Sequence, residues 1–135
     1  KLRKNYSHKD NSCIVHISEG INSVLLPGDI TQLREQELIT EKTLLKSTVL
    51  VSPHHGSKTS SSNMFIKAVS PEVVIHSTAF KGQWNLPHEE VLKRYDAINA
   101  QQYTTAEHGQ IIVKFYKSGY EISSARAQSD WFLKD

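Results

Sequence analysis

The sequence predicts an α/β fold with a mixed sheet. Short β-branched runs alternate with segments of helical periodicity, and strand pairs joined by turns occur near both ends of the chain. The 135 residues are 38% apolar and 22% charged, which is typical of one globular domain. We expect a single, partial domain over residues 1–135, with a linker at 1–11 and a tail at 124–135.

The first part of the chain predicts a hairpin and then a helix. Two apolar runs, residues 13–17 and 24–26, are separated by "EGIN", which indicates a β-hairpin. Residues 30–46 mix apolar and charged positions, which predicts one helix or two short ones, with Thr31 as an early cap. Cys13 is the only cysteine, so no internal disulfide forms, and we expect it to be a small core residue.

Strands and helices then alternate. The runs "STVLVS" and "PEVVIHS" are rich in valine and isoleucine, as strands buried on both faces are. Apolar spacing predicts helices over residues 63–69 and from residue 88 onward, with a loop at 78–87. "QIIVKFY" and residues 120–123 predict a second hairpin.

Charge and hydropathy exclude some functions. A formal net charge of +2 permits contact with a polyanion but gives no strong electrostatic footprint for one. No apolar run approaches the roughly 20 residues of a membrane span, and no signal-peptide core follows the basic start, so we expect a soluble piece. Trp84 and Trp131 are expected to be packing anchors rather than base-stacking platforms.

The stretch "VSPHHGSKTSSS" carries the strongest chemical signal. His54 and His55 directly follow a strand, where imidazoles can ligate metal, exchange protons or touch phosphate. Gly56 permits a tight turn beside them. For the hydroxyl-rich residues 57–62, solvent contact and helix capping are the commoner reading, and phosphate contact is the alternative.

Other candidates follow neighbouring strands. Asp29 comes after a strand and a glycine, at the end where α/β folds gather ligands, although an aspartate in such a place more commonly caps a helix. His88 can begin a helix, where the positive end of the dipole favours the neutral imidazole. We expect His76 to be a core histidine. Three further histidines are expected at surface or hairpin-loop positions: His8, His16 and His108.

The order of "NSVLLPGDI", "VLVSPHHGSKTSSS", "PEVVIHS", "LPHEEVLKRY" and "HGQIIV" across residues 11–113 resembles the C-terminal metallo-β-lactamase-fold domain of the ComEC family, the DNA-internalisation proteins of bacterial competence. The family's H-x-D-x-D-H motif is absent, and "SHKDNS" reads as a linker. The resemblance therefore implies the C-terminal half of an αββα sandwich, without the half that carries most ligands.

The resemblance also implies a metal-dependent phosphodiesterase or nuclease that degrades the DNA strand that is not transported. It assigns Asp29, His54 and His88 to zinc or manganese, with two ions in the intact domain and none necessarily bound in this piece. Catalytic roles go to His55 and Ser57, and phosphate contacts to Lys58 and Ser60. Which of His54 and His55 ligates stays open, and the piece alone is expected to be inactive.

Two other readings remain. The chain could be a non-catalytic module that guides DNA or contacts the uptake channel, or a phosphoesterase acting on a small substrate. The expected partners are DNA, a membrane channel in the same polypeptide, and a second copy of the chain. The expected location is a soluble domain of an inner-membrane protein on the periplasmic side.

Overall fold

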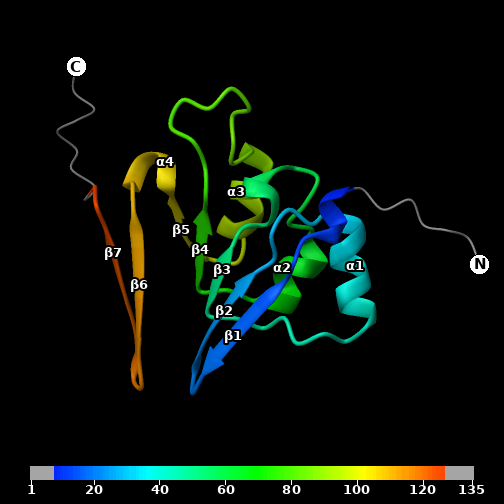
Figure 1. Cartoon of the computed structure of the whole chain (residues 1–135), viewed down its shortest axis with the longest axis horizontal. Helices are drawn as coiled ribbons and strands as arrows, with labels where there is room; N and C mark the ends of the chain where they lie inside the picture. Colours follow the sequence, from blue (N-terminus) through cyan, green and yellow to red (C-terminus); the bar gives the residue numbers. More distant parts are fainter. Residues whose placement is uncertain (1–7, 127–135) are drawn as a thin grey trace, which may run out of the picture.

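The computed structural model describes residues 8–126 and shows two sheets, with helices along one side of the larger sheet (Figure 1). The strands of the larger sheet pair both parallel and antiparallel. The predicted α/β class, with a mixed sheet and flanking helices, is therefore confirmed, and the arrangement is consistent with an αββα type of fold.

The larger sheet has five strands in the order in which they occur in the chain. They are β1 (Val15–Glu19), β2 (Asn22–Leu26), β3 (Val49–Val51), β4 (Val73–His76) and β5 (Gln101–Thr104). The first two form the predicted antiparallel hairpin, and β2 to β5 run parallel. The carboxyl ends of β2, β3 and β4 therefore meet at one edge, where the loops of α/β folds bind ligands.

The helices α1 (Gln32–Thr40), α2 (Asn63–Val69) and α3 (Glu89–Asp96) cover one face of this sheet (Figure 1). The core between them is built from apolar side chains that are at most 1% exposed, including Leu25, Leu50, Val74, Phe65 and Tyr95. Burying a side chain of this size contributes about 1.5–3 kcal/mol. This packing holds the parallel strands, and hence their loops, in place.

A second hairpin, β6 (Ile111–Tyr116) and β7 (Gly119–Ser124), lies on the opposite side of the sheet from the helices (Figure 1). It follows the short helix α4 (Thr105–His108). The Asn22 amide donates to the Tyr116 carbonyl at 2.6 Å, and the Tyr120 hydroxyl donates to Glu72 at 2.9 Å. These two bonds connect the hairpin to the larger sheet.

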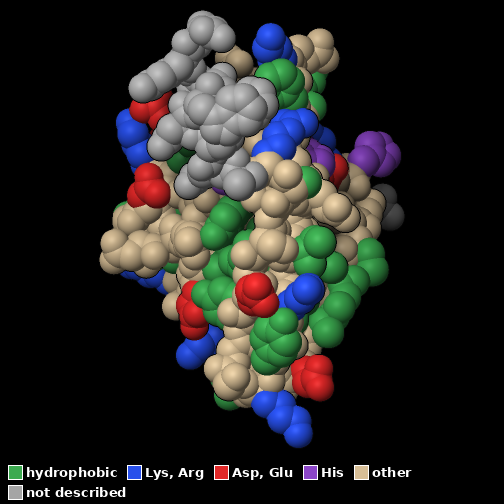
Figure 2. All heavy atoms as spheres, turned by 90° about the vertical axis from the view of Figure 1, so that its left-hand side faces the viewer, with side chains coloured by type: hydrophobic (Ala, Val, Ile, Leu, Met, Phe, Trp, Pro, Cys, Tyr) green, Lys and Arg blue, Asp and Glu red, His purple; other side chains and the backbone are tan. Residues whose placement is uncertain are grey.

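Apolar side chains gather on the side of the molecule that carries this hairpin (Figure 2). Ile17 on β1 is 55% exposed, and Ile112 and Tyr116 on β6 are 42% and 50% exposed. The face is thus distinct from the strand edge at which the candidate loops lie. Within residues 8–126, no helix has the length and hydropathy needed to cross a bilayer.

Two elements were not predicted. β5 has the polar sequence "QQYT" and forms through pairing with β4, with Val73 opposite Gln101, so its own residues do not reveal it. The one-turn helix α4 begins after Thr104, whose hydroxyl accepts from the Glu107 amide. The first predicted helix is a single one, which ends at Thr40 instead of extending toward residue 46.

Three burial predictions were wrong. Cys13 is exposed because it precedes β1 at the edge of the sheet. Trp84 is 75% exposed because it lies in the loop between β4 and α3. His108 is only 6% exposed, since α4 turns it against the Tyr103 ring. His76 is fully buried, as predicted.

The expected linker and tail lie partly outside the described residues, and Trp131 lies wholly outside them. Within the expected linker, residues His8–Asn11 form a 3-10 turn, η1, that contacts the start of α1. The Thr31 amide and hydroxyl both donate to the Asp10 carboxylate, at 2.9 and 2.7 Å. Thr31 occupies the predicted cap position of α1, but its hydroxyl bonds to Asp10 rather than to the helix.

Candidate functional site

Three loops meet at the carboxyl edge of the parallel strands. They follow β2, β3 and β4, and backbone hydrogen bonds connect them. The His54 amide donates to the Gly28 carbonyl, and the His88 amide donates to the Gly56 carbonyl, each at 2.9 Å. Asp29 follows Gly28 and does not cap α1, which begins after Thr31. The residues predicted from sequence thus lie along one edge.

The turn η2 (Pro53–Gly56) sets the direction of the two adjacent imidazoles. Its φ angles are 50° at His54, 57° at His55 and 79° at Gly56, which is left-handed backbone. A Cβ on Gly56 would lie 2.5 Å from Cβ of Pro87, so only glycine fits beneath that loop. The turn directs the neighbouring rings to different partners.

His55 pairs with Asp29. The Nδ1 atom of His55 lies 2.8 Å from the Ser77 carbonyl, which can only accept, so Nδ1 carries the proton. The Nε2 atom lies 3.4 Å from the Asp29 carboxylate. In the neutral tautomer Nε2 holds a lone pair. Nε2 and the facing Asp29 oxygen can therefore share one proton, or both can act as ligands to a cation. Both side chains are about half exposed and are accessible to a substrate.

His54 turns to other partners. Its Nε2 lies 2.6 Å from the Lys9 ammonium, and its Nδ1 lies 3.2 Å from the Thr59 hydroxyl. Partial burial, and then the charge of Lys9, lower the pKa of His54 and favour its neutral form. The Lys9 ammonium therefore occupies one of the two ring nitrogens of His54 that can bind a metal ion.

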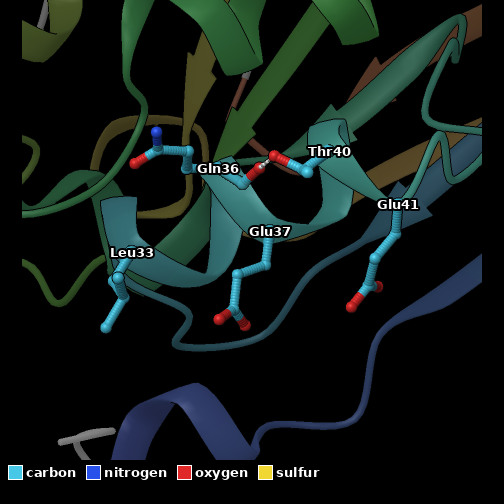
Figure 3. Close-up of a pocket in the computed structure, with 5 residues that line it drawn as sticks. All are labelled: Leu33, Gln36, Glu37, Thr40 and Glu41. Carbon is cyan, nitrogen blue, oxygen red and sulfur yellow. Dashed lines mark hydrogen bonds between the residues drawn. The ribbon is translucent and has the colours of Figure 1, made fainter. Parts of the chain in front are cut away.

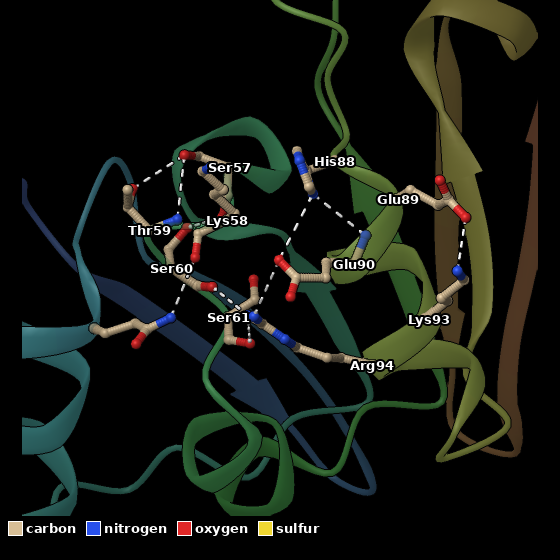
Figure 4. A network of polar contacts seen from close by, with 11 residues as sticks. Ser57, Lys58, Thr59, Ser60, Ser61, His88, Glu89, Glu90, Lys93 and Arg94 are labelled. Atoms are coloured by element: carbon tan, nitrogen blue, oxygen red, sulfur yellow. Dashed lines mark hydrogen bonds and ion pairs between the residues drawn. The ribbon is translucent and has the colours of Figure 1, made fainter.

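His88 is the N-cap of α3, at the helix start predicted for it. Its Nδ1 accepts from the Glu90 amide at 3.3 Å, and the Glu90 carboxylate lies 4.0 Å from the same nitrogen. Figure 4 shows Glu90 between His88 and Arg94. The backbone of α3 thus orients the His88 ring, and the bond from the His88 amide to Gly56 holds the residue beside the turn η2.

These residues do not by themselves fit a metal centre. Zinc sites ordinarily have at least three protein ligands. Asp29 and His55 supply two convergent donors, and residues 8–126 contain no group of three or more histidine, cysteine or acidic side chains that could hold a metal ion.

The serine loop, residues 57–62, follows this turn and is folded inward (Figure 4). The Ser57 hydroxyl lies 3.0 Å from that of Thr59, and the Lys58 carbonyl accepts from Gln32 at 3.2 Å. Ser60 is fully buried, and its hydroxyl donates to the Pro53 carbonyl at 3.0 Å. Ser57 and Lys58 therefore remain nearer the surface than Ser60. The hydrogen bonds of Ser60 hold the loop against the turn η2.

A buried carboxylate that the sequence reading missed holds this loop. Glu35 on α1 is fully buried, and its two oxygens accept from the amides of Ser61 and Ser62 at 2.5 and 2.9 Å. Burial raises the pKa of Glu35 above its ordinary value, although both amide bonds oppose this. Its spacing of three from the buried Leu38 was the available signal, because both lie on one helix face.

Two residues of α3 complete the support. Arg94 donates to the carbonyls of Ser60 and Ser61 at 3.1 and 3.0 Å (Figure 4). The Tyr95 hydroxyl lies 2.8 Å from that of Ser61. We call Glu35, Arg94 and Tyr95 the buried clamp, since together they bond three successive residues of the serine loop.

His76 supports the neighbouring turn from below. The Gln102 amide nitrogen donates to the Leu92 carbonyl at 3.0 Å, so the Gln102 oxygen faces His76 Nε2, at 2.9 Å, and accepts its proton. His76 Nδ1 is then left to accept from the Ser52 hydroxyl at 2.8 Å. Burial lowers the pKa of His76, so the ring is neutral in the fold.

The candidate site is an exposed edge and not an enclosed cavity. A hollow lies along α1, lined by Leu33, Gln36, Glu37, Thr40 and Glu41 (Figure 3). No residue of the three loops lines it, so it is separate from the turn η2, which we call the histidine turn.

The chain is similar to segments of larger proteins. It is 38% identical over 125 residues to recombination protein 2 of Haemophilus influenzae, covering 92% of this chain and 16% of the relative. It is 31% identical over 133 residues to competence protein ComA of Neisseria gonorrhoeae, covering 98% and 19%. It is 28% identical over 109 residues to ComE operon protein 3 of Bacillus subtilis, covering 81% and 14%. The chain thus spans less than a fifth of each relative.

These findings correct the assignment made from the sequence. That assignment named the C-terminal half of a metallo-β-lactamase-fold domain of the ComEC family. No family model matches the chain. What the comparisons support instead is similarity to a short segment of larger, competence-type proteins.

Proposed function

We propose that this chain contributes part of a phosphodiesterase site to a protein that takes up DNA. The observation that carries the proposal is the pairing of His55 with Asp29, at 3.4 Å, where the loops of three neighbouring parallel strands meet. The relatives' names, a recombination protein and a competence protein, support DNA as the substrate.

In this proposal Nε2 of His55 and the Asp29 carboxylate, which face each other, act as a pair: together they take the proton of the attacking water and return it to the leaving oxygen. The Ser77 carbonyl keeps the other ring nitrogen protonated and so fixes the tautomer. Ser57 and Lys58, from the outer part of the serine loop, contact the phosphate as a hydroxyl donor and a positive charge. General acid–base catalysis of this kind contributes about 10²–10⁴-fold in rate.

A metal-assisted version needs ligands from outside the described residues. Asp29, His54 and His88 remain the proposed contribution of this chain to a zinc or manganese set, and Lys9 would have to leave His54 Nε2 first. Residues 8–126 do not assemble such a set by themselves.

The test replaces the matching segment of the Haemophilus relative with this chain and measures nucleotide release from labelled DNA during uptake. Asp29→Ala and His55→Ala should each reduce release about 100-fold, because each removes one half of the acid–base pair. His16→Ala is the matched control, since His16 lies on β1 and its ring bonds to the Lys46 carbonyl, which belongs to none of the three loops. Unchanged release in both site variants would refute the proposal.

A second candidate is a non-catalytic module that guides DNA. The absence of a three-ligand group among residues 8–126 favours it. In the same experiment this function predicts that the site variants lower DNA uptake and leave nucleotide release per imported strand unchanged.

A further inference from the structure

We propose that the loop of residues 77–87, between β4 and α3, is a platform on which an unpaired DNA base stacks beside the candidate site. We call it the aromatic loop. The choice of DNA rests on the function proposed above, but the residues are different ones. The inference adds a substrate class to that function: single-stranded DNA, held by base stacking.

The aromatic loop exposes two large rings. Trp84 is 75% exposed and Phe80 is 66% exposed. Aromatic side chains that serve packing are buried, as Phe65 and Tyr95 are in this fold. Figure 1 shows this loop extending beyond the carboxyl edge of the sheet. The rings are therefore available to a partner.

Both ends of the aromatic loop are fixed at the candidate site. At one end the Ser77 carbonyl accepts from His55, and the Thr78 amide donates to Thr105 at 2.8 Å. At the other end Pro87 packs directly over Gly56. The loop thus begins and ends beside the histidine turn, and a strand whose phosphate contacts His55 would carry its neighbouring bases toward the exposed rings.

The charges around the loop suit a nucleic acid. The Lys81 ammonium lies 5.5 Å from the centroid of the Phe80 ring, and the Arg126 guanidinium lies 5.9 Å from it. Residues 77–87 contain no acidic side chain. Stacking of a base on an aromatic side chain contributes about 1–3 kcal/mol, and nearby cations contact the backbone.

The exposed rings select single strands. In a duplex each base is stacked on its neighbours, so its face cannot reach a protein ring unless the helix opens. Tryptophan and lysine also occur where proteins meet a lipid surface. The attachment of the loop to His55 favours DNA over lipid, and the experiment includes both.

The experiment uses the Trp131→Phe variant, in which Trp84 is the only remaining tryptophan of the two. Its fluorescence is recorded during titration with short oligo(dT), a duplex of equal length, inorganic phosphate, and vesicles of neutral and anionic phospholipid. We expect oligo(dT) to quench Trp84, and the duplex, phosphate and vesicles to leave it unchanged.

Binding is also measured by anisotropy of labelled oligo(dT). Trp84→Ala and Phe80→Ala should each weaken binding about tenfold, since about 1.4 kcal/mol of stacking corresponds to that factor. Trp84→Phe should retain most of the affinity because it keeps a ring. Phe115→Ala is the control, because that ring is 36% exposed on the second hairpin.

The outcomes separate the two proposals. Absent binding of oligo(dT), equal quenching by the duplex, quenching by vesicles alone, or unchanged affinity of Trp84→Ala would each overturn the stacking platform. Unchanged affinity of Trp84→Ala would leave the hydrolytic function standing. Conversely, Trp84-dependent binding with unaltered nucleotide release in the Asp29 and His55 variants would support the platform and refute hydrolysis.

Discussion

The serine loop and the aromatic loop lie on either side of the same histidine turn but are built in opposite ways. In the serine loop Ser60 and Ser61 are fully buried, and the buried clamp bonds its backbone. In the aromatic loop the two largest side chains extend into solvent, although the loop is bonded at its ends.

The difference shows how one edge of a sheet can combine a loop of fixed backbone position with a loop that exposes side chains for binding. A buried, fully bonded network fixes backbone position, because an alternative position would leave polar groups without partners. A loop with exposed rings gives up that constraint and offers surface for binding. Of the three predictions below, two concern this contrast and one concerns His76, which lies beneath the turn between the two loops. The largest expected effect comes first.

Glu35→Ala should destabilise the fold by about 3 kcal/mol, because two buried amides of the serine loop lose their acceptors. Chemical denaturation followed by circular dichroism measures this. Glu41→Ala is the control, since Glu41 follows the same helix and is 57% exposed, with Arg34 as an exposed partner at 3.6 Å. Equal destabilisation by both variants would show that the bonds of Glu35 to the serine loop do not stabilise the fold more than an exposed ion pair does.

His76→Gln should lower the free energy of unfolding by about 1 kcal/mol at neutral pH, because hydrogen bonds are lost. It should also change how this free energy depends on pH. The pKa of His76 is lowered in the fold, so only the unfolded chain gains this proton as the pH falls below about 6.5. The His76 contribution is therefore present above that pH and is lost below it.

Unfolding free energies at a series of pH values give the test. The wild type should lose more stability on acidification below about pH 6.5 than His76→Gln does, because the glutamine cannot titrate. Glu35, whose pKa is raised, acts in the opposite direction in both proteins and cancels in the comparison. Parallel curves would remove His76 as the source of acid sensitivity.

Phe80→Ala and Trp84→Ala should change stability by less than about 0.5 kcal/mol, because their rings contribute little to packing. Thermal unfolding of each variant measures this, with Phe65→Ala as the contrasting loss of a fully buried ring. A loss above 1 kcal/mol at position 84 would mean that the aromatic loop is packed in solution and is not free to stack on a base.

Much of the fold was predictable because its signals are local. The valine-rich strands β3 and β4 and the helix α2 were predicted from apolar runs and spacing, and the structure confirms them. The polar strand β5 was not predictable, since its position at the edge of the sheet depends on pairing with β4. Exposure of Trp84 was also missed, because residue type alone favours packing.

The sequence predicted which residues form the candidate site, but not how their side chains face one another. The sequence identified Asp29, His54, His55 and His88 by their positions after strands, and the structure brings their loops together. It could not show that His55 faces Asp29 while His54 faces Lys9, because a left-handed turn decides this. Glu35 was missed because its partners come from a distant loop.

The histidine turn has a consequence for how this sequence can vary. A left-handed conformation costs a residue with a Cβ roughly 1–2 kcal/mol relative to glycine, and two such residues stand here in succession. Selection for thermal robustness alone would drive both positions toward glycine or asparagine. Under the proposed function, imidazoles at these positions exchange thermal robustness for chemistry, as strained residues at active sites do.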